Sequence, residues 1–401
     1  MNMDANTNGE KLHLNRLLRS KERCQKLVLT VCSVLMTFVF LEVSMRIWIN
    51  NFAGERRFLK YASLKQLEKK YSNIKPRWSV HRYLGHIPTP DYSKDENKHN
   101  SLGYRADEIT IPKPKGQFRI VCLGGSTTYT TSIENYQLSY PNLLEKELRE
   151  RGLKNINVVN AGVGAYTSWE SLINFEFRVL DLQPDMVIIY HGVNDILSRL
   201  VWPPDAYKGD NSGSVSATSM TMPNILEYST LIRYLMIRLD IVEPHAHLER
   251  SLKKIPDTNY ANMFYQQNVK NKYPDGIFKQ VSAEKMLMTN KPEYFRRNIE
   301  NIIAIAQYRK IETVIATFAY CPGFDDNPVV ACGEFVSAYD EMNQVLKSLS
   351  EKTHVNLFDF ASSFPKDKIY FTDGIHVNID GAKLKAKMFA DYLIDKGLLP
   401  N

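Results

Sequence analysis

The chain is poor in several features that mark common classes of protein. Its 401 residues include only 5 cysteines and 4 tryptophans, and no segment repeats another. No stripe of basic residues interleaved with aromatic ones runs along it, which argues against a nucleic-acid-binding surface. The net charge of +7 is modest, and an apolar content of 44% excludes wholesale disorder. We expect one large globular domain with shorter appended segments.

Groups that would hold a metal or a nucleotide are also scarce. His245 and His247 have the spacing His-x-His, but no cysteine or cluster of carboxylates accompanies them, and such a pair alone is weak evidence for a metal. A nucleotide site would need lysine or aspartate partners at set distances from a glycine-rich turn, and the sequence lacks them. We expect neither a metal nor a cofactor.

One long apolar run lies near the N-terminus. Residues 27–41 are almost uninterrupted in apolar character, and the run continues through Glu42 and Arg46 to residue 49. A transmembrane helix needs about 20 mainly apolar residues. Glu42 and Arg46 stand four apart on a helix, so they can pair near one end of the span. The sequence predicts a transmembrane anchor at residues 27–49.

Basic residues before this run set its expected orientation. A cleaved signal peptide would have the same basic start, but this run is long and no small-x-small cleavage site follows it closely. We therefore expect an uncleaved signal anchor in a plasma or inner membrane. Residues 1–26 would form a cytoplasmic tail, and the chain after about residue 50 would be extracytoplasmic.

The cysteines fit an oxidising compartment. Cys24 and Cys32 belong to the anchor region, and Cys122 lies in an apolar run. Cys321 and Cys332 remain, and they flank a short loop. We predict a disulfide between these two, with two unpaired thiols as the alternative.

The chain from residue 118 to residue 401 alternates predicted strands with predicted helices. Five apolar runs predict strands, at residues 119–123, 158–160, 186–190, 313–318 and 355–358. Five helical patterns follow them, at residues 140–151, 168–180, 292–309, 333–351 and 380–396. This alternation predicts an α/β domain whose parallel sheet is covered on both faces. The polar segment 50–117 that precedes it is predicted to form an extended stalk that packs on the catalytic domain near its end.

The alternation is interrupted once, between residues 197 and 290. This length far exceeds an ordinary connection, so the segment is either a lid or an inserted subdomain. Residues 225–239 within it predict a strongly apolar helix. That helix could cover an acyl-binding groove, rest on a membrane surface, or form part of a core.

The first predicted strand ends in the sequence Gly-Gly-Ser-Thr-Thr. Gly124 and Gly125 permit backbone angles that a β-carbon forbids, so the chain can turn sharply and present Ser126 at the carboxyl edge of the sheet. Substrates bind at that edge in open α/β sheets. Ser126 is therefore a candidate nucleophile. The alternative is a glycine turn that caps a helix or binds a phosphate.

Three further motifs follow later strands and would supply the other groups that a nucleophilic serine needs. The turn at residues 160–168 consists of small residues whose backbone N–H groups can point into a site. Asn194, in His-Gly-Val-Asn-Asp, offers a side-chain amide. Asp373 and His376 stand three residues apart, so His376 can act as base and Asp373 can orient it.

Each motif also has an ordinary structural explanation. Asp195 could simply cap the helix after its strand, and residues 373–376 could form an aspartate-glycine turn. Four such motifs in order, each at a strand end, favour an active site over coincidence.

The four blocks Gly-Gly-Ser-Thr, Asn-Ala-Gly-Val-Gly-Ala, Gly-Val-Asn-Asp and Asp-Gly-Ile-His resemble the signature blocks of the SGNH hydrolases, also called GDSL lipases and esterases. The resemblance runs from about residue 118 to residue 393, with 197–290 as an interruption. It implies a flavodoxin-like, three-layer α/β/α fold. The chain is similar in particular to bacterial members with an N-terminal membrane anchor, in which a segment like residues 100–105 precedes the first strand.

The resemblance also implies roles for individual residues. Ser126 would be the nucleophile and first oxyanion donor, Asn194 an oxyanion donor, His376 the base and Asp373 its orienter. The family's usual oxyanion glycine falls on Ala165, beside Gly164. Alanine serves there if its backbone angles are ordinary, whereas a required positive φ would weaken the oxyanion hole.

These roles imply a serine esterase that acts on short O-acyl esters, such as acetyl esters, of a small molecule, lipid or glycan. An O-acyltransferase would use the same site if a sugar hydroxyl replaced water. A catalytically silent module that binds envelope glycans is the alternative from another class, but it would lack a catalytic residue and this sequence has all four. The oligomeric state cannot be inferred.

Overall fold

The computed structural model describes residues 4–71, 76–81, 83–201, 204–209, 228–242, 244, 281–331 and 333–400. The chain forms two compact units. Unit 1 comprises Met1–Asn73 and Thr218–Arg250, and unit 2 comprises Ile74–Ala217 and Ser251–Asn401. The sequence places its main boundary at residue 117 instead, so the predicted stalk is divided between the two units.

Unit 2 is built on a five-stranded parallel sheet with the strand order β6-β5-β7-β8-β9. The strands are β5 (Phe118–Gly124), β6 (Ile156–Asn160), β7 (Met186–Tyr190), β8 (Glu312–Ala316) and β9 (Asn356–Phe358). This order is the flavodoxin-like one, in which the first strand lies between the second and the third. The predicted α/β fold with a parallel sheet is confirmed, and all five strands lie within a few residues of their predicted positions.

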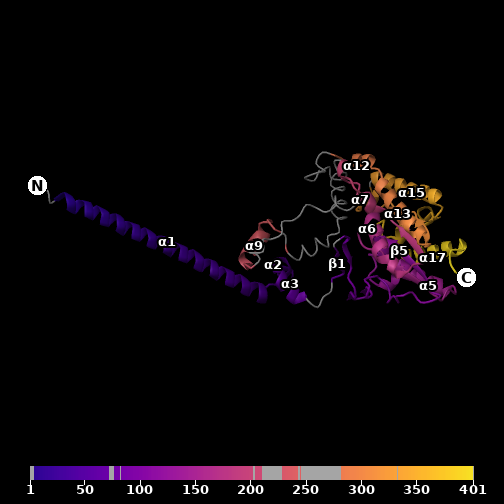
Figure 1. Cartoon of the computed structure of the whole chain (residues 1–401), viewed down its shortest axis with the longest axis horizontal. Helices are drawn as coiled ribbons and strands as arrows, with labels where there is room; N and C mark the ends of the chain where they lie inside the picture. The colour runs from indigo at the N-terminus through magenta and orange to yellow at the C-terminus, as the bar shows by residue number, and fades with distance from the viewer. Residues whose placement is uncertain are drawn as a thin grey trace. The chain divides into compact units, whose positions relative to one another are not determined.

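Helices cover the sheet, as Figure 1 shows around β5. Helix α5 (Tyr140–Glu150) packs against α17 (Ile379–Asp395), whereas α13 (Glu293–Tyr308) packs against α6 (Ser168–Asn174) and α15 (Gly333–Thr353). The helix predicted at residues 168–180 ends early, because its last part is a π-helical turn followed by a 3₁₀ turn.

The remaining helices in the described part of unit 2 are short. They are α4 (Ser126–Tyr129), α7 (Val193–Leu197), α12 (Ala283–Thr289), α14 (Pro328–Ala331) and α16 (Phe360–Ser363). The single-turn elements are η1 (Tyr136–Leu138), η2 (Phe175–Val179), η3 (Leu180–Leu182), η4 (Pro204–Ala206) and η6 (Lys368–Tyr370).

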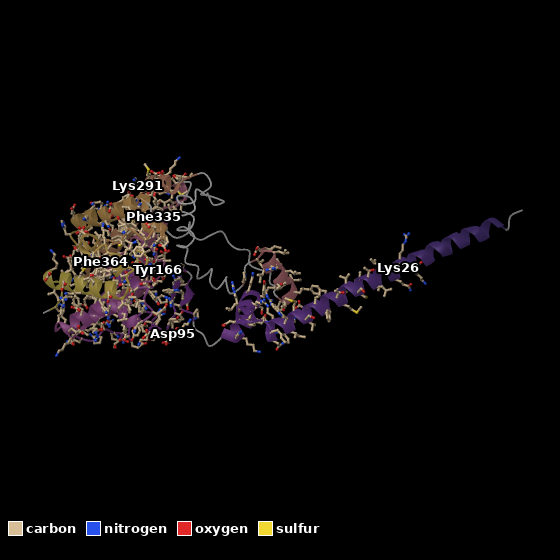
Figure 2. All side chains as sticks on the ribbon, turned by 180° about the vertical axis from the view of Figure 1, so that it is seen from behind. Lys26, Asp95, Tyr166, Lys291, Phe335 and Phe364 are labelled. Carbon is tan, nitrogen blue, oxygen red and sulfur yellow. The ribbon has the colours of Figure 1, made fainter. Side chains whose placement is uncertain are left out.

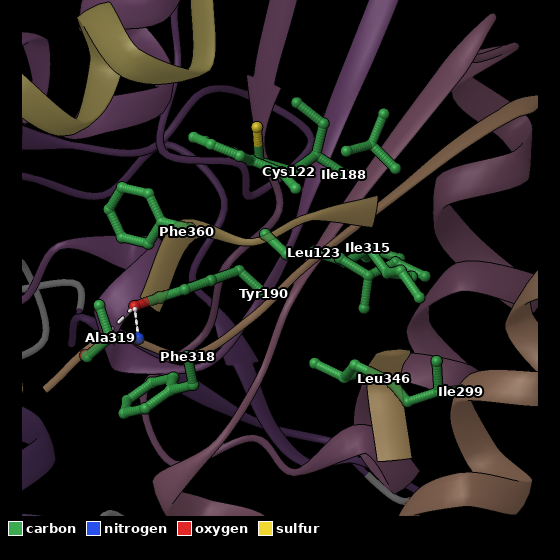
Figure 3. Packing of buried hydrophobic residues seen from close by; sticks show 14 of the residues in the cluster. Cys122, Leu123, Ile188, Tyr190, Ile299, Ile315, Phe318, Ala319, Leu346 and Phe360 are labelled. Atoms are coloured by element: carbon green, nitrogen blue, oxygen red, sulfur yellow. Dashed lines mark hydrogen bonds between the residues drawn. The ribbon is translucent and has the colours of Figure 1, made fainter. Parts of the chain in front are cut away.

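Strand β7 is apolar throughout because both of its faces are covered. Every residue of β7 is buried, and Figure 3 shows Leu123, Ile188 and Ile315 from three neighbouring strands in one cluster. At the end of β7 the Tyr190 hydroxyl accepts a hydrogen bond of 3.2 Å from Ala319 N–H. This hydrogen bond ties the carboxyl end of β7 to the loop that follows β8.

From residue 76 on, the described part of the segment before β5 belongs to unit 2. It forms two small antiparallel hairpins, β1 (Trp78–His81) with β2 (Gly85–Pro88), and β3 (Ser93–Lys94) with β4 (Asn97–Lys98). Trp78 lies in a buried cluster with Tyr129 and Tyr166. The segment therefore packs against the loops that follow β5 and β6.

Arg105 is the main polar link between this segment and the loop after Ser126. Its side chain is buried, and all five of its N–H groups have acceptors: the Asn97 side chain and the carbonyls of Tyr129, Thr130, Ile133 and Glu134. Its guanidinium also lies over the Tyr129 ring, 4.6 Å from the centroid. One side chain thus fixes the course of the chain directly after the candidate nucleophile.

Unit 1 contains α1 (Asp4–Asn51), α2 (Glu55–Tyr61), α3 (Leu64–Tyr71) and α9 (Thr230–Arg238). Residues Lys21–Asn51 of α1 are long and apolar enough to cross a membrane, with a mean hydropathy of 2.2 in their most apolar window. Lys26 marks the start of the apolar run (Figure 2). The predicted Glu42–Arg46 pair is present, at 2.6 Å.

The insertion is described only in part. Of the helix predicted at residues 225–239, α9 covers Thr230–Arg238, and residues 225–227 lie outside the described residues. Arg233 and Ile237 of α9 are buried, the latter in a cluster with Ile49 and Phe58. His245 and His247 also lie outside the described residues.

Replacement of Arg105 by methionine should destabilise unit 2 by about 3 kcal/mol or more, because buried carbonyls would lose their donors at about 1–3 kcal/mol each. Urea unfolding of the full chain in detergent micelles, followed by tryptophan fluorescence, measures the change.

Arg151→Met is the matched control, since Arg151 makes surface ion pairs with Glu147 and Asp391 and its loss should cost about 1 kcal/mol at most. Equal effects of the two substitutions would show that Arg105 is not a special anchor.

Candidate active site

Ser126 is the first residue of α4, directly after the end of β5. Neither Gly124 nor Gly125 has a positive φ, so the sequence argument from special backbone angles is wrong. The glycines are required for space instead. A Cβ on Gly124 would lie 2.4 Å from the carbonyl oxygen of Tyr190, and one on Gly125 would lie 2.7 Å from the Asn194 amide nitrogen.

Ser126, His376 and Asp373 form a continuous hydrogen-bonded chain. Ser126 Oγ lies 2.8 Å from His376 Nε2, and His376 Nδ1 lies 2.7 Å from Asp373 Oδ2. Because a carboxylate can only accept, Nδ1 carries the proton and Nε2 is free to accept from the serine hydroxyl. The three residues that the sequence singles out therefore have the geometry of a nucleophile, a base and an orienting group.

Asp373 is held as an anion by its own loop. Its Oδ1 accepts hydrogen bonds from the backbone N–H groups of Ile375 and His376, at 3.0 and 2.8 Å. Burial alone would raise the pKa of this carboxyl, but the hydrogen bonds and the charge of His376 outweigh burial, and the net pKa is lowered. The carboxylate is therefore charged at neutral pH and can stabilise a protonated His376.

The loop that carries Asp373 is fixed from outside by residues 320–331. Asn327 donates its amide to the Asp373 carbonyl at 2.7 Å, and Cys321 N–H donates to the Gly374 carbonyl at 2.7 Å. Gly374 has φ +92°, and a Cβ there would lie 2.7 Å from the Cys321 carbonyl oxygen. This glycine is required both by its backbone angle and by the close approach.

The predicted Cys321–Cys332 disulfide is not formed. Cys321 is a buried free thiol, which contacts the carbonyl of Pro322 at 3.4 Å. Cys332 lies outside the described residues. The sequence placed the two cysteines at the ends of a loop, but the backbone of Cys321 is directed by its pairing with Gly374, and its side chain is covered within its own loop.

The candidate oxyanion donors gather around Gly125. The N–H of Ser126 stands in the first turn of α4, where it has no acceptor within the helix. Asn194 is buried, and its amide donates to the Tyr166 carbonyl at 2.9 Å, which fixes the plane of the amide. Ala165 has φ +62°. A positive φ at this position is the condition under which we expect a weaker oxyanion hole. The left-handed conformation costs a non-glycine residue about 1–2 kcal/mol.

The strained turn at Ala165 is supported by the hairpin of β1 and β2. His86 Nε2 lies 2.9 Å from the Gly164 carbonyl oxygen, and Tyr166 donates its hydroxyl to the His86 carbonyl at 2.5 Å. Because the acceptor is a carbonyl, His86 Nε2 must carry the proton. Burial lowers the pKa of His86, which favours the neutral ring. Sequence reasoning missed His86, because nothing near it in the chain identifies its partner.

A buried polar network lies behind the second and third motifs. Asp195 accepts hydrogen bonds from the backbone and hydroxyl of Ser168, and the Asn298 amide donates to the same hydroxyl at 3.0 Å. His191 stands 3.5 Å from Asp195 and contacts Ser171 at 2.8 Å. The sequence offered Asp195 only as a helix cap, whereas the structure shows that it joins the loop of Asn194 to the start of α6.

The described residues contain no group of three or more histidine, cysteine or acidic side chains that could hold a metal ion.

Residues 122–384 match the model of the GDSL-like lipase/acylhydrolase family. The chain belongs to this family. The matched range includes Ser126, Asn194, Asp373 and His376. Members of the family are acylhydrolases, so hydrolysis of ester bonds is the chemistry expected of the chain.

Several solved structures resemble the chain at low sequence identity. A lipase/acylhydrolase from Enterococcus faecalis is 15% identical, with 70% of this chain and 97% of that chain covered and a TM-score of 0.40. The acetyl xylan esterase AlAXEase is 13% identical, with 69% and 100% covered and a TM-score of 0.41. A GDSL-like lipase from Bacteroides thetaiotaomicron is 12% identical, with 72% and 93% covered and a TM-score of 0.39. No curated protein matches the chain.

The Asp195 network predicts a specific pH dependence of stability. Burial raises the pKa of Asp195 to about 7, although the hydrogen bonds from Ser168 oppose the shift. Between about pH 4 and pH 7 the folded protein thus keeps a proton that the unfolded chain has released, so this group's contribution to stability falls as pH rises. Asp195→Asn removes the titration. Its free energy of unfolding, relative to the parent chain, should rise by up to about 1.4 kcal/mol per pH unit in this window.

Urea unfolding of both proteins at a series of pH values tests this. His191, whose pKa burial lowers to about 3, is present in both proteins, so its contribution cancels in the difference. If the difference in free energy of unfolding between the two proteins does not change with pH, Asp195 is ionised in the folded state.

Proposed function

We propose that this member of the family is a membrane-anchored serine esterase that removes short acyl groups, such as acetyl, from O-acylated lipids or glycans outside the cytoplasmic membrane. The observation that carries the esterase assignment is the hydrogen-bonded chain from Asp373 through His376 to Ser126. The anchored location is supported by α1, whose apolar part is long enough to span a bilayer.

The reaction begins when Ser126 Oγ attacks the ester carbonyl carbon and its proton passes to His376 Nε2. The tetrahedral oxyanion is stabilised by the N–H of Ser126, a backbone N–H of the Gly164–Ala165 turn and the Asn194 amide. Asp373 stabilises the imidazolium that forms. His376 then gives the proton to the departing alkoxide, which leaves an acyl-serine.

Water completes the cycle. His376 takes a proton from a water molecule, which attacks the acyl-serine, and the acid is released as Ser126 regains its proton. A sugar hydroxyl in place of water would transfer the acyl group instead. A silent binding module is disfavoured, because Ser126 and His376 are already in hydrogen-bond contact and Asp373 orients the histidine.

Ser126→Ala and His376→Ala should each lower the rate of p-nitrophenyl acetate hydrolysis by at least about 10³-fold, because each removes a member of the catalytic chain. The full chain in detergent micelles is the sample. Labelling by a fluorophosphonate, read by mass spectrometry, should occur at Ser126 and be lost in both variants. Ser363→Ala, an exposed serine on α16, is the matched control and should keep full activity.

Hydrolysis that survives Ser126→Ala would overturn the assignment. Labelling of Ser126 without hydrolysis would point to transfer, and acyl products formed on an added oligosaccharide would then identify the transferase.

His86 should act as a positioning residue for this reaction. The Gly164 carbonyl and the Ala165 N–H belong to one trans peptide and point in opposite directions, so the hydrogen bond from His86 to the carbonyl also orients the N–H. His86→Leu should therefore lower kcat by about 10- to 100-fold, up to the value of one oxyanion donor, and leave KM nearly unchanged.

His86→Gln retains an N–H donor and should restore part of kcat. Equal losses in the two variants, or a loss that appears in KM alone, would contradict the role.

A further inference from the structure

The N-terminus of α9 is completed by side chains of α1. Glu42 accepts hydrogen bonds from the backbone N–H groups of Thr230 and Leu231, at 2.9 and 2.8 Å, and from the Ser229 hydroxyl at 2.9 Å. The same hydroxyl accepts from Ile232 N–H at 3.1 Å. Three of the four N–H groups that the start of a helix leaves without an internal partner, those of Thr230, Leu231 and Ile232, are thus satisfied by side chains.

Acceptors from the protein are needed for these N–H groups where water is absent. A helix end in water needs only one capping side chain, since solvent serves the other groups, whereas in a bilayer each unsatisfied group costs several kcal/mol. Glu42 itself is paired with Arg46, which also donates to the Tyr228 carbonyl at 2.6 Å. Both charges and the helix end therefore belong to one polar cluster, in which Glu42 is mostly covered and Arg46 remains 55% exposed.

The position of Glu42 along α1 places this cluster near a membrane boundary. A hydrocarbon layer of about 30 Å corresponds to about 20 helical residues, and counted from the first residue after Lys26 it ends near Arg46. Glu42 follows the apolar run directly. The N-terminus of α9 therefore lies at the outer edge of the hydrocarbon if α1 spans the bilayer.

One side of α9 is apolar and exposed. Leu235 and Leu239 stand four residues apart on the helix and are 47% and 67% exposed, and Ile241 after the helix is 48% exposed. The opposite side, with Arg233 and Ile237, is buried. Tyr234 meets Trp48 edge to face at 6.4 Å, and this pair of residue types is the one enriched where a bilayer meets water.

The neighbouring helices of unit 1 add positive charge. Residues 55–71, which form α2 and α3, include six basic and two acidic side chains. Phosphate groups of anionic lipids attract such segments by about 1 kcal/mol per basic residue near the surface. An apolar strip flanked by basic helices is the pattern of a helix that lies in the plane of a membrane surface.

We propose that α9 is an interfacial helix that embeds its Leu235–Leu239 side in the outer surface of an anionic phospholipid bilayer, held there by Glu42 of the anchor. Helix α9 thereby serves to dock unit 1 on lipid. This inference rests on the proposed membrane anchor and is independent of the esterase reaction.

The depth of α9 can be measured by spin labelling of the full chain in phospholipid nanodiscs of phosphatidylcholine and phosphatidylglycerol. Cys24, Cys32 and Cys332 are replaced by serine, and a single label is placed by Leu239→Cys. Relaxation by oxygen, which enters the bilayer, is compared with relaxation by a nickel chelate, which does not. We expect nickel accessibility at residue 239 to be several-fold lower than at Tyr308→Cys, a label site in unit 2 that is 84% exposed.

A third label, placed by Leu35→Cys in the apolar run, distinguishes failure of the interfacial helix from failure of the membrane anchor. A deep label at residue 35 with a water-exposed label at 239 would overturn the interfacial helix and leave the anchor intact. Exposure at both positions would overturn the anchor and the interfacial helix together. Strong dipolar coupling between labels at 239 on neighbouring copies, at low accessibility to both reagents, would overturn lipid docking in favour of a second copy of the chain.

Two further variants test the cause of the docking. Glu42→Gln removes the charge that holds the N-terminus of α9 and should raise nickel accessibility at residue 239 but not at 35. If the basic helices α2 and α3 contribute to docking, nickel accessibility at residue 239 should be several-fold higher in nanodiscs of phosphatidylcholine alone. No change in either case would overturn the roles assigned to Glu42 and to the anionic lipid.

Discussion

The hydrogen bond between His376 and Ser126 joins two residues that lie 250 positions apart in the chain. It forms because parallel strands deliver their carboxyl ends, and the loops that follow, to one edge of the sheet. The sheet therefore does more than form a core. The order β6-β5-β7-β8-β9 puts the serine loop after the central strand β5, between the loops of Asn194 and Ala165, so three of the four motifs come from adjacent strands.

A site made of loops must be held from outside the sheet, and different parts of unit 2 do this. The segment before β5 fixes the turn after Ser126 through Arg105 and the turn at Ala165 through His86. Residues 320–331 fix the loop of Asp373. The strained Ala165 is tolerable in this setting, because its neighbours on both sides are hydrogen-bonded to His86. Preorganisation of this kind is what oxyanion stabilisation requires.

In unit 1, polar groups lie beside an apolar helix and need hydrogen-bond partners within the protein. Glu42 and Arg46 would be unfavourable as isolated charges near a bilayer, and the first turn of α9 would be unfavourable without acceptors. In the folded protein the Glu42 carboxylate pairs with Arg46 and accepts the N–H groups of α9, so each group has a partner. The insertion between β7 and β8 thus contributes a helix to unit 1, although its ends belong to unit 2.

The sequence by itself determined the α/β alternation, the long apolar helix near the N-terminus and the residues of the hydrogen-bonded chain Ser126–His376–Asp373. These depend on short-range patterns: apolar runs, a glycine-serine turn, and an aspartate three residues before a histidine. The tertiary structure alone decided the rest. His86 and Arg105 donate hydrogen bonds to backbone carbonyls. Every residue has a backbone carbonyl, so the sequence does not indicate which one is the partner. The positive φ of Ala165, the raised pKa of Asp195, the free thiol of Cys321 and the pairing of α9 with α1 all depend on contacts between segments distant in the chain, and such contacts exist only once the chain is folded.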